Sequence, residues 1–478
     1  MKIPSPVSLN AQSLTQQDVS VTRKMAASLP KLREVAAAKG LPIHHLGAGY
    51  PHPEVTDPRG FLTHQARYFE FLAAAEGLND ADALPEYLRE SFAYTDTLGP
   101  ASVRAAFAQV YGQDWGQTLQ PDRLIPTVGA TGGISMLCSL FERPGVPLAY
   151  ITDAPTYAGF LARSSLAANA RIFSVELDEQ GPNPTQFRDQ ILAARAAGFF
   201  VPFYYTVPDG HNPAGISFSL ERRKDILAVA QELGVLIVED APYLYISYTA
   251  ERPTAFLALD AKQTVHLFTG SKIGFPGPRI GFVYSDAVVE LAEGNQVLLT
   301  DLLLTEASSE ILFQNPAALM GFEALLHESD SSAAAGNDGQ FHLRESLWEV
   351  AETKLPLYRE NRQILLDGLE RGLGRHKDRF HWTIPQAGFF SVFTFLNPKA
   401  DTAVTTDDAF IEKLVAEFGV VVIPMYDFYP EDARQRDPKA GLNQLRLSFC
   451  FTESTGAQRR ADLAAAVDAF CGAVLKVA

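Results

Sequence analysis

Hydrophobic and polar positions divide this chain into short apolar runs and longer segments with helical spacing. Ser219 can cap a helix whose apolar positions recur every three or four residues until Gly234 ends it. One apolar run precedes this helix at 199–206 and another follows it at 235–238, and runs of this length are typical of buried strands. The order strand, helix, strand predicts parallel pairing through a right-handed crossover.

The same pattern predicts further elements on both sides of this unit. Two more buried strands are expected at 148–152 and 265–268. Helices are expected from Met25 to near Gly40, within 54–90, at 101–111, at 134–141, within 299–350 and over 347–373. In the C-terminal part, strands at 380–384, 389–395, 420–423 and 445–449 are separated by helices at 409–418 and 457–474. The sequence therefore predicts an α/β region with a parallel sheet, followed by a smaller α+β region.

Composition limits the classes of function. The chain has 478 residues, of which 47% are hydrophobic and 20% charged, so two or three globular domains are expected. A net charge of −16 argues against nucleic-acid and anionic-membrane partners. The three cysteines have no metal-ligand spacing and the ten histidines form no zinc motif, so no metal site and a reducing cytoplasm are expected. No apolar run approaches the ~18 residues of a membrane helix, and no signal peptide is recognisable.

Lys272 is the strongest candidate for chemistry. It follows the strand at 265–268, with hydroxyl residues on its amino side and Arg279 seven positions on, beyond a Gly/Pro turn. A lysine can condense with a carbonyl only when its amine is neutral, so its pKa must be lowered by burial or by nearby positive charge. Thr269 and Ser271 can donate to a phosphate, and Arg279 offers a planar fork for one. The competing interpretation is a surface Lys and Arg in a loop.

Polar side chains also follow the other predicted strands. Asn212 lies in a turn-rich loop after 199–206, and Asp240 and Tyr243 follow 235–238. The carboxyl ends of parallel strands meet at one edge of a sheet, where open α/β sheets bind ligands. Arg446 interrupts an apolar strand, and a buried charge is costly unless it is paired. A protein carboxylate is the ordinary partner for such an arginine.

These segments together resemble class I/II aminotransferases of fold type I, which depend on pyridoxal 5′-phosphate. The segment from Thr269 to Arg279 is similar to the family's lysine motif, and Asn212-Pro-Ala-Gly and Asp240-Ala-Pro-Tyr243 are similar to two others. The resemblance extends over residues 43 to 460 and is strongest to the 2-aminoadipate, kynurenine and aromatic amino acid branch. Thr269, Gly270 and Ala241 depart from the residues usual in the family.

The resemblance implies roles for individual residues. Lys272, Asp240 and Tyr243 are the expected catalytic residues, with Lys272 bound to the cofactor and acting as base and then acid on the substrate Cα. Asp240 would pair with the cofactor's ring nitrogen, and Tyr157 would stack on the ring. Tyr94 would reach across a dimer to the partner's cofactor phosphate. The other expected cofactor-binding residues are Gly129, Ala130, Thr131, Asn212, Tyr243, Thr269, Ser271, Lys272 and Arg279. The substrate carboxylate would meet Arg446, Asn212 and Gly49.

The family's fold implies a large domain with a mostly parallel seven-stranded sheet and a smaller α+β domain. We expect an N-terminal arm and part of the small domain at 1–45, the large domain at 46–345 and the small domain at 346–478. The stretch around 325–345, with its Ser- and Ala-rich patch from Ser329 to Gly339, is expected to be an exposed insertion. A cytoplasmic homodimer acting on an amino acid and a 2-oxo acid is the implied assembly.

Three functions remain open at this point. The first is a ping-pong aminotransferase for an aromatic, aminoadipate-like or large apolar amino acid, with Tyr426, Phe428, Tyr50 and Phe275 as candidate pocket residues. The second is another reaction on the same cofactor, namely decarboxylation, β/γ-elimination or replacement, or oxidation by O2. The third is a regulator without catalysis or an inactive relative, although about 45 residues before the core are too few and too neutral for a DNA-binding domain.

Overall fold

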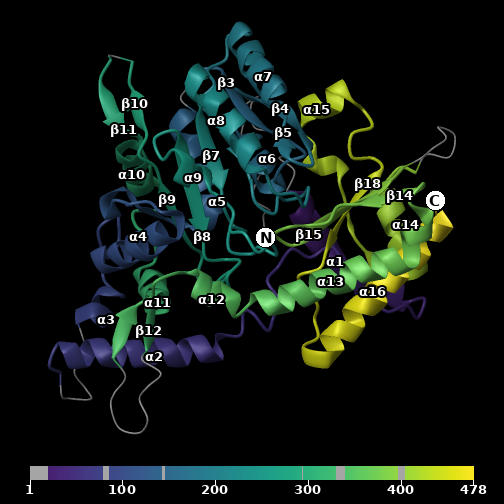
Figure 1. Ribbon diagram of the computed structural model, residues 1–478, viewed down its shortest axis with the longest axis horizontal. Coiled ribbons are helices and arrows are strands. Elements are labelled where there is room, and N and C mark those ends of the chain that lie inside the picture. Colours follow the sequence, from purple (N-terminus) through teal and green to yellow (C-terminus); the bar gives the residue numbers. More distant parts are fainter. Residues whose placement is uncertain are drawn as a thin grey trace, which may run out of the picture.

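The computed structural model describes residues 20–78, 86–142, 146–292, 294–329, 340–396 and 404–477. Two sheets organise these residues: an eight-stranded sheet occupies the left and centre of Figure 1, and a four-stranded sheet lies to the right. The expected combination of an α/β part and a smaller α+β part is therefore confirmed.

The large sheet has the strand order β2-β9-β8-β7-β6-β3-β4-β5. Its strands are β2 (Ile125–Val128), β3 (Leu148–Ala154), β4 (Ala170–Asp178), β5 (Gly181–Pro182), β6 (Phe203–Thr206), β7 (Leu236–Asp240), β8 (Thr264–Thr269) and β9 (Ile280–Tyr284). The central strands from β4 to β8 pair in parallel, and β2, β9 and β5 join antiparallel. The sheet has one strand more than expected, because the two residues of β5 turn back along the end of β4.

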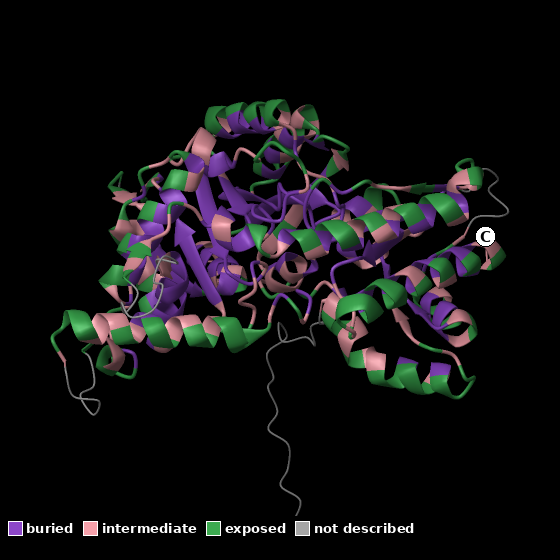
Figure 2. Cartoon of the chain, turned by 60° about the horizontal axis from the view of Figure 1, so that its bottom comes forward, coloured by how far each residue is buried: buried purple, intermediate pink, exposed green. Residues whose placement is uncertain are grey.

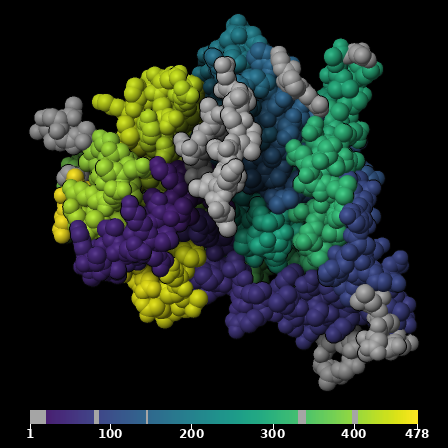
Figure 3. All heavy atoms as spheres, turned by 180° about the vertical axis from the view of Figure 1, so that it is seen from behind, coloured from purple at the N-terminus to yellow at the C-terminus, as the bar shows by residue number. Residues whose placement is uncertain are grey.

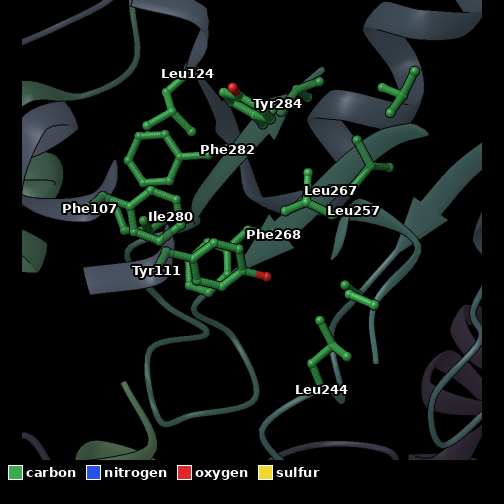
Figure 4. Packing of buried hydrophobic residues seen from close by; sticks show 14 of the residues in the cluster. Phe107, Tyr111, Leu124, Leu244, Leu257, Leu267, Phe268, Ile280, Phe282 and Tyr284 are labelled. Carbon is green, nitrogen blue, oxygen red and sulfur yellow. The ribbon is translucent and has the colours of Figure 1, made fainter. Parts of the chain in front are cut away.

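Helices cover both faces of this sheet. They are α4 (Ala101–Trp115), α5 (Gly129–Phe141), α6 (Ala158–Ser164), α7 (Pro184–Ala196), α8 (Leu220–Leu233), α9 (Phe256–Leu259), α10 (Leu299–Glu310) and α11 (Pro316–Leu326). Alternate residues of one strand belong to different cores: Phe203 and Tyr205 pack in one cluster, and Tyr204 packs in the other. Figure 4 shows the first cluster, where Phe107 lies against Phe282 with ring centroids 4.5 Å apart. Because the strands are buried on both faces, polar groups gather at the strand ends.

The small sheet is antiparallel, in the order β14-β15-β18-β17. Its strands are β14 (Phe380–Trp382), β15 (Phe390–Phe395), β17 (Ile423–Pro424) and β18 (Gln444–Ser448), and its helices are α13 (Leu355–Leu373), α14 (Asp408–Phe418), α15 (Glu431–Arg436) and α16 (Gly456–Val477). Helix α1 (Val21–Ala37) contacts α14, and β1 (His44–His45) pairs with β16 (Val420–Val421). Figure 3 shows this N-terminal segment, in purple, lying against the yellow and light-green C-terminal elements.

Several predicted boundaries differ from the structure. The helix expected over 347–373 is interrupted: α12 (Trp348–Glu352) ends before α13 begins, and Pro356 lies in the first turn of α13. A proline is accepted at a helix start but not in its interior, which accounts for the break. Helix α5 begins at Gly129 instead of Ile134, because Gly129 adopts a left-handed φ of 65° that lets the chain turn directly out of β2. The strand predicted at 199–206 begins only at Phe203.

The remaining elements lie around the large sheet. They are α2 (Pro58–Ala75), α3 (Glu86–Glu90), the hairpin β10 (Val288–Glu290) with β11 (Gln296–Leu298), and the hairpin β12 (His327–Ser329) with β13 (Phe341–Leu343). Helix α2 buries only Tyr68 and is largely green and pink in Figure 2. Most of the expected insertion, 330–339, lies outside the described residues. In the part of the chain that is described, no helix is long and apolar enough to span a bilayer.

Candidate active site

The candidate site lies at the carboxyl ends of the parallel strands, where the small sheet meets the large one. Strand β7 ends at Asp240 and β8 ends at Thr269, three residues before Lys272. From the small sheet, β18 contributes Arg446 and β15 contributes Phe390. Residues from distant parts of the sequence therefore meet at one edge, as the strand order predicts.

Lys272 is held in a mostly apolar position. Its Nζ donates to the carbonyl oxygen of Gly49 at 3.2 Å and lies 5.7 Å from the ring centroids of Tyr243 and Phe389. Burial lowers the pKa of Lys272 to about 8, and the positive charges of Arg446 and Arg279 act in the same direction. A substantial fraction of this amine is therefore neutral near pH 8, as a nucleophilic lysine requires.

Groups suited to an anion meet at the N-terminus of α5. The Gly129 N–H donates to the Arg279 carbonyl at 2.8 Å, and Arg279 Nη1 donates to Ser271 Oγ at 3.2 Å. Thr269 Oγ1 donates to Ser271 Oγ at 3.0 Å. The first turn of α5 contains Ala130 and Thr131, and no side chain caps it. Free backbone N–H groups at a helix start, next to a guanidinium, are suited to a phosphate.

Asp240 has one bonded and one unbonded carboxylate oxygen. Its Oδ2 accepts from the Tyr205 hydroxyl at 2.7 Å, whereas Oδ1 is buried and accepts nothing from the described residues. Burial raises the pKa of Asp240 to about 6, and the Tyr205 hydrogen bond, His266 and Lys272 oppose that rise. A buried acceptor left without a donor costs about 1–3 kcal/mol, so Oδ1 is a position where a ligand donor would stabilise the protein.

Arg446 is buried without a carboxylate partner among the described residues, so the ordinary interpretation of this arginine is wrong. Its Nη1 donates to Asn212 Oδ1 at 2.8 Å and its Nη2 to the Gly47 carbonyl at 3.0 Å. The guanidinium lies 4.1 Å from the ring centroid of Phe390, and burial lowers the pKa of Arg446 to about 10. A Cβ on Gly49 would lie 2.8 Å from the Phe390 ring, so glycine is needed for the backbone to approach that ring and Arg446 so closely.

Two of the predicted tyrosines differ in their surroundings. Tyr157, between β3 and α6, is half-buried, and burial raises its pKa, as does the nearby Asp240. Tyr94 is 88% exposed, and its ring contacts Phe313 with centroids 5.6 Å apart. The described chain thus brings together all the predicted site residues except Tyr94, which lies on the surface.

The aromatic pocket expected from four residues stays a prediction, because rings that line one pocket need not touch each other. No ring contact within the described residues joins any two of Tyr50, Phe275, Tyr426 and Phe428. Phe428 packs under the guanidinium of Arg446 at 5.1 Å instead. Sequence reasoning also assigned no role to Tyr205, because a tyrosine inside an apolar strand gives the same signal as any core aromatic.

Comparison with known proteins identifies the family. The family described as aminotransferase class I and II matches residues 73–455, which is well over half of the chain. A (S)-3,5-dihydroxyphenylglycine transaminase of Amycolatopsis orientalis is 27% identical over 90% of this chain and 88% of its own length. An aromatic-amino-acid aminotransferase of Thermococcus litoralis is 24% identical over 77% of this chain and 78% of its own. The kynurenine aminotransferase structure of Pyrococcus horikoshii has a TM-score of 0.72, 21% identity and 94% coverage of both chains.

The chain belongs to the class I and II aminotransferases. It is a fold-type-I enzyme that uses pyridoxal 5′-phosphate and transfers amino groups of amino acids, which confirms the predicted fold, cofactor and activity. Of the three functions left open by the sequence, transamination is the one that the family supports.

Proposed function

We propose that this enzyme moves the amino group of an L-amino acid with an aromatic, aminoadipate-like or large apolar side chain to a 2-oxo acid, by a ping-pong mechanism. The observation that carries the proposal is Arg446, a buried guanidinium bonded to Asn212 and free of any described carboxylate. Such a group requires an anion, and the α-carboxylate common to both substrates supplies one.

The residues fit the cofactor at two independent points. Asp240 Oδ1 is a buried acceptor that lacks a donor, which suits a protonated ring nitrogen. Gly129 lets the Arg279 guanidinium lie directly against the start of α5, because a Cβ there would be 2.5 Å from Nη2, and a guanidinium in that position suits a phosphate bound at the helix N-terminus. We assign the phosphate to Arg279, Ser271, Thr269 and the first turn of α5, and assign the ring to Asp240, Tyr157, Asn212 and Tyr243. When bound, the cofactor supplies an aldehyde for the amino group and a cationic ring that accepts electron density.

The chain's own residues then divide the work. Arg446 and Asn212 hold the substrate carboxylate, with the backbone at Gly49 close by. Lys272 Nζ takes the proton from the substrate Cα and, in the second half-reaction, returns a proton to the Cα of the incoming oxo acid. Its lowered pKa lets the amine serve as base near neutral pH. Asp240 keeps a negative charge beside the ring throughout the reaction. Together with Lys272 and Asp240, Tyr243 completes the proposed set of catalytic residues.

The proposed substrate class rests on the activities named for the relatives, and a panel of amino acid donors can test it. Their names specify dihydroxyphenylglycine, aromatic and kynurenine substrates, all bulky amino acids. We expect Phe, Tyr, Trp, Leu or 2-aminoadipate to release its oxo acid with 2-oxoglutarate or pyruvate as acceptor. Without an acceptor, release should stop near one equivalent per site, and Lys272→Ala should release none. Inactivity with all five donors would overturn the substrate class, and continued turnover without acceptor would overturn transamination.

A homodimer with shared sites is also part of the proposal. Phe92 is 90% exposed and Tyr94 is 88% exposed, and Leu312 is 51% exposed near the Tyr94 contact at Phe313. Large apolar side chains at such exposure favour an interface with another protein surface. We propose that Tyr94 reaches the partner subunit's phosphate pocket, which would account for its absence from the cluster in its own chain.

We further propose the domain division 1–45, 46–345 and 346–478, and a cytoplasmic location. The pairing of β1 with β16 and the contact of α1 with α14 support assigning the segment before residue 46 to the small domain. All three cysteines are free and buried, which is consistent with a reducing compartment.

A further inference from the structure

Tyr205 lies under the candidate site and forms a hydrogen bond that no assigned role explains. It is fully buried in β6, between Thr152 of β3 and Val238 of β7. Its ring stacks on Phe160, with centroids 4.1 Å apart and planes 10° from parallel. Stacking on Phe160 therefore restricts the orientation of the ring and of its hydroxyl.

That hydroxyl meets the carboxylate that faces the cofactor ring. Tyr205 donates to Asp240 Oδ2 at 2.7 Å, and Asp240 Oδ1 remains the oxygen without a donor. Burial raises the pKa of Tyr205 well above its ordinary value, so the hydroxyl stays protonated and can only donate to this carboxylate. One oxygen of Asp240 is thereby occupied, and the carboxylate cannot rotate freely.

We propose that Tyr205 is a positioning residue for the cofactor ring: it orients Asp240 so that Oδ1 meets the ring nitrogen, and it keeps that carboxylate ionised. The proposal rests on the proposed role of Asp240. The Tyr205 hydroxyl donates a hydrogen bond to a carboxylate, and a hydrogen bond to a charged group favours the charged form of the acceptor. Two other groups act on Asp240 in the same direction, His266 from β8 and Lys272, but neither forms a hydrogen bond with it in the structure.

Removing the hydroxyl should have two linked effects. Without the Tyr205 donor, the pKa of Asp240 should rise further, because burial raises this pKa and the lost hydrogen bond lowered it. A neutral Asp240 cannot hold a protonated ring nitrogen, so the nitrogen should lose its proton and the cofactor part of its affinity. Packing should change little, since Tyr205→Phe keeps the ring against Phe160.

The test is cofactor binding by apo-enzyme, compared between pyridoxal phosphate and its carbocyclic analogue, in which C–H replaces the ring nitrogen. For Tyr205→Phe we expect affinity to fall about tenfold for pyridoxal phosphate and less than twofold for the analogue. The matched control is Tyr150→Phe: Tyr150 is equally buried, also contacts Phe160, and donates to Glu142 Oε1 at 2.8 Å. This control should bind both molecules as the wild type does.

Two measurements separate positioning from simple destabilisation. In the ¹⁵N NMR spectrum of enzyme loaded with ring-labelled cofactor, Tyr205→Phe should move the nitrogen resonance toward the unprotonated value, and Tyr150→Phe should not. In an Asp240→Asn background, Tyr205→Phe should cause no further loss of affinity, because the hydroxyl acts only through the carboxylate. Equal losses for both cofactor forms, or an unchanged nitrogen resonance, would overturn the inference. A wild-type enzyme that binds no cofactor would instead refute the proposed site.

Discussion

Arg446 and Asn212 are 234 residues apart in sequence, and their side chains meet at 2.8 Å, between the small sheet and the loop after β6. The position of the guanidinium therefore depends on how the small sheet packs against the loop after β6. Arg446→Lys keeps a positive charge but loses the fork, since a lysine has one donor group where arginine has two parallel N–H bonds.

We expect Arg446→Lys to raise KM for both amino acid and 2-oxo acid and to lower kcat/KM roughly 10- to 100-fold, the loss of a hydrogen bond to a charged group. Cofactor affinity should change less than threefold. The control is Arg459→Lys, another buried arginine, whose partners are Asn361, Glu360 and Glu54 and not the groups that hold Arg446. That variant should alter thermal stability but not KM, and equal KM changes in both would contradict the role of Arg446.

Gly129 and Gly116 provide a matched pair for testing the phosphate pocket. Both have left-handed φ angles, 65° and 62°, but a Cβ would lie 2.5 Å from Arg279 Nη2 at Gly129 and would meet nothing within 4 Å at Gly116. Each Gly→Ala change should cost about 1 kcal/mol in stability from the backbone alone.

Only Gly129→Ala should also displace Arg279 and weaken cofactor binding, by about tenfold or more, because a phosphate–guanidinium bond is lost. Thermal unfolding of the apo-enzymes and titration with pyridoxal phosphate measure the two effects separately. If Gly116→Ala weakened cofactor binding equally, backbone strain would be the cause of the loss, and not the displacement of Arg279.

Asp240→Asn should stabilise the apo-enzyme while harming the holoenzyme. The pKa of Asp240 is raised from 3.8 to about 6 in the folded chain, so its contribution to stability is full below about pH 4 and is lost as pH rises through 6. Above pH 6 the wild-type apo-enzyme must bury a carboxylate, and the variant does not. The free energy of unfolding of the variant should therefore exceed that of the wild type by a margin that is small at pH 4 and reaches about 3 kcal/mol at pH 8.

Chemical denaturation of both apo-enzymes across this pH range measures the difference, and kcat of the holoenzyme should fall at least 100-fold. Asp209→Asn is the contrasting variant, because Asp209 is also buried but forms an ion pair with Arg223 at 2.6 Å. Removing that carboxylate leaves the buried Arg223 guanidinium with only the more distant carboxylate of Glu239, 3.7 Å away, so the Asp209→Asn variant should be less stable than the wild type. If the difference in free energy of unfolding between Asp240→Asn and the wild type did not change between pH 4 and 8, the raised pKa of Asp240 would be contradicted.

The sequence predicted the chemical groups of the site better than their surroundings. Lys272 and Arg279 could be found because a reactive lysine beside a phosphate site requires a short local motif. The partner of Arg446 could not be found in this way, because residues 212 and 446 meet only through the packing of two sheets. The general expectation of a protein carboxylate failed here, since the structure gives this guanidinium an amide oxygen and a backbone carbonyl and leaves its buried Nε without a described acceptor.

Element boundaries were missed where backbone geometry overrides residue preference. Ile134 is the first apolar residue of α5, and a periodicity argument therefore begins the helix there. The left-handed conformation of Gly129 has no signature in hydrophobic periodicity, yet it sets the helix start to which we assign the cofactor phosphate. The role of Tyr205 was hidden for a related reason, because burial and hydrogen bonding in a central strand leave the same apolar pattern.

The proposed role of Tyr94 leads to a prediction about a dimer of two different variants. If Tyr94 serves the partner subunit's site, Tyr94→Ala and Lys272→Ala subunits should complement each other, because a mixed dimer contains one site with the Lys272 of one chain and the Tyr94 of the other. With random pairing, half of the dimers are mixed and each has one intact site, so co-refolded protein should recover about a quarter of wild-type activity. Each variant refolded alone sets the baseline, and Phe92→Ala in place of Tyr94→Ala controls for a surface change nearby. Sedimentation measures the assembly, and either a monomer or activity no greater than the mean of the separate variants would show that Tyr94 does not act across an interface.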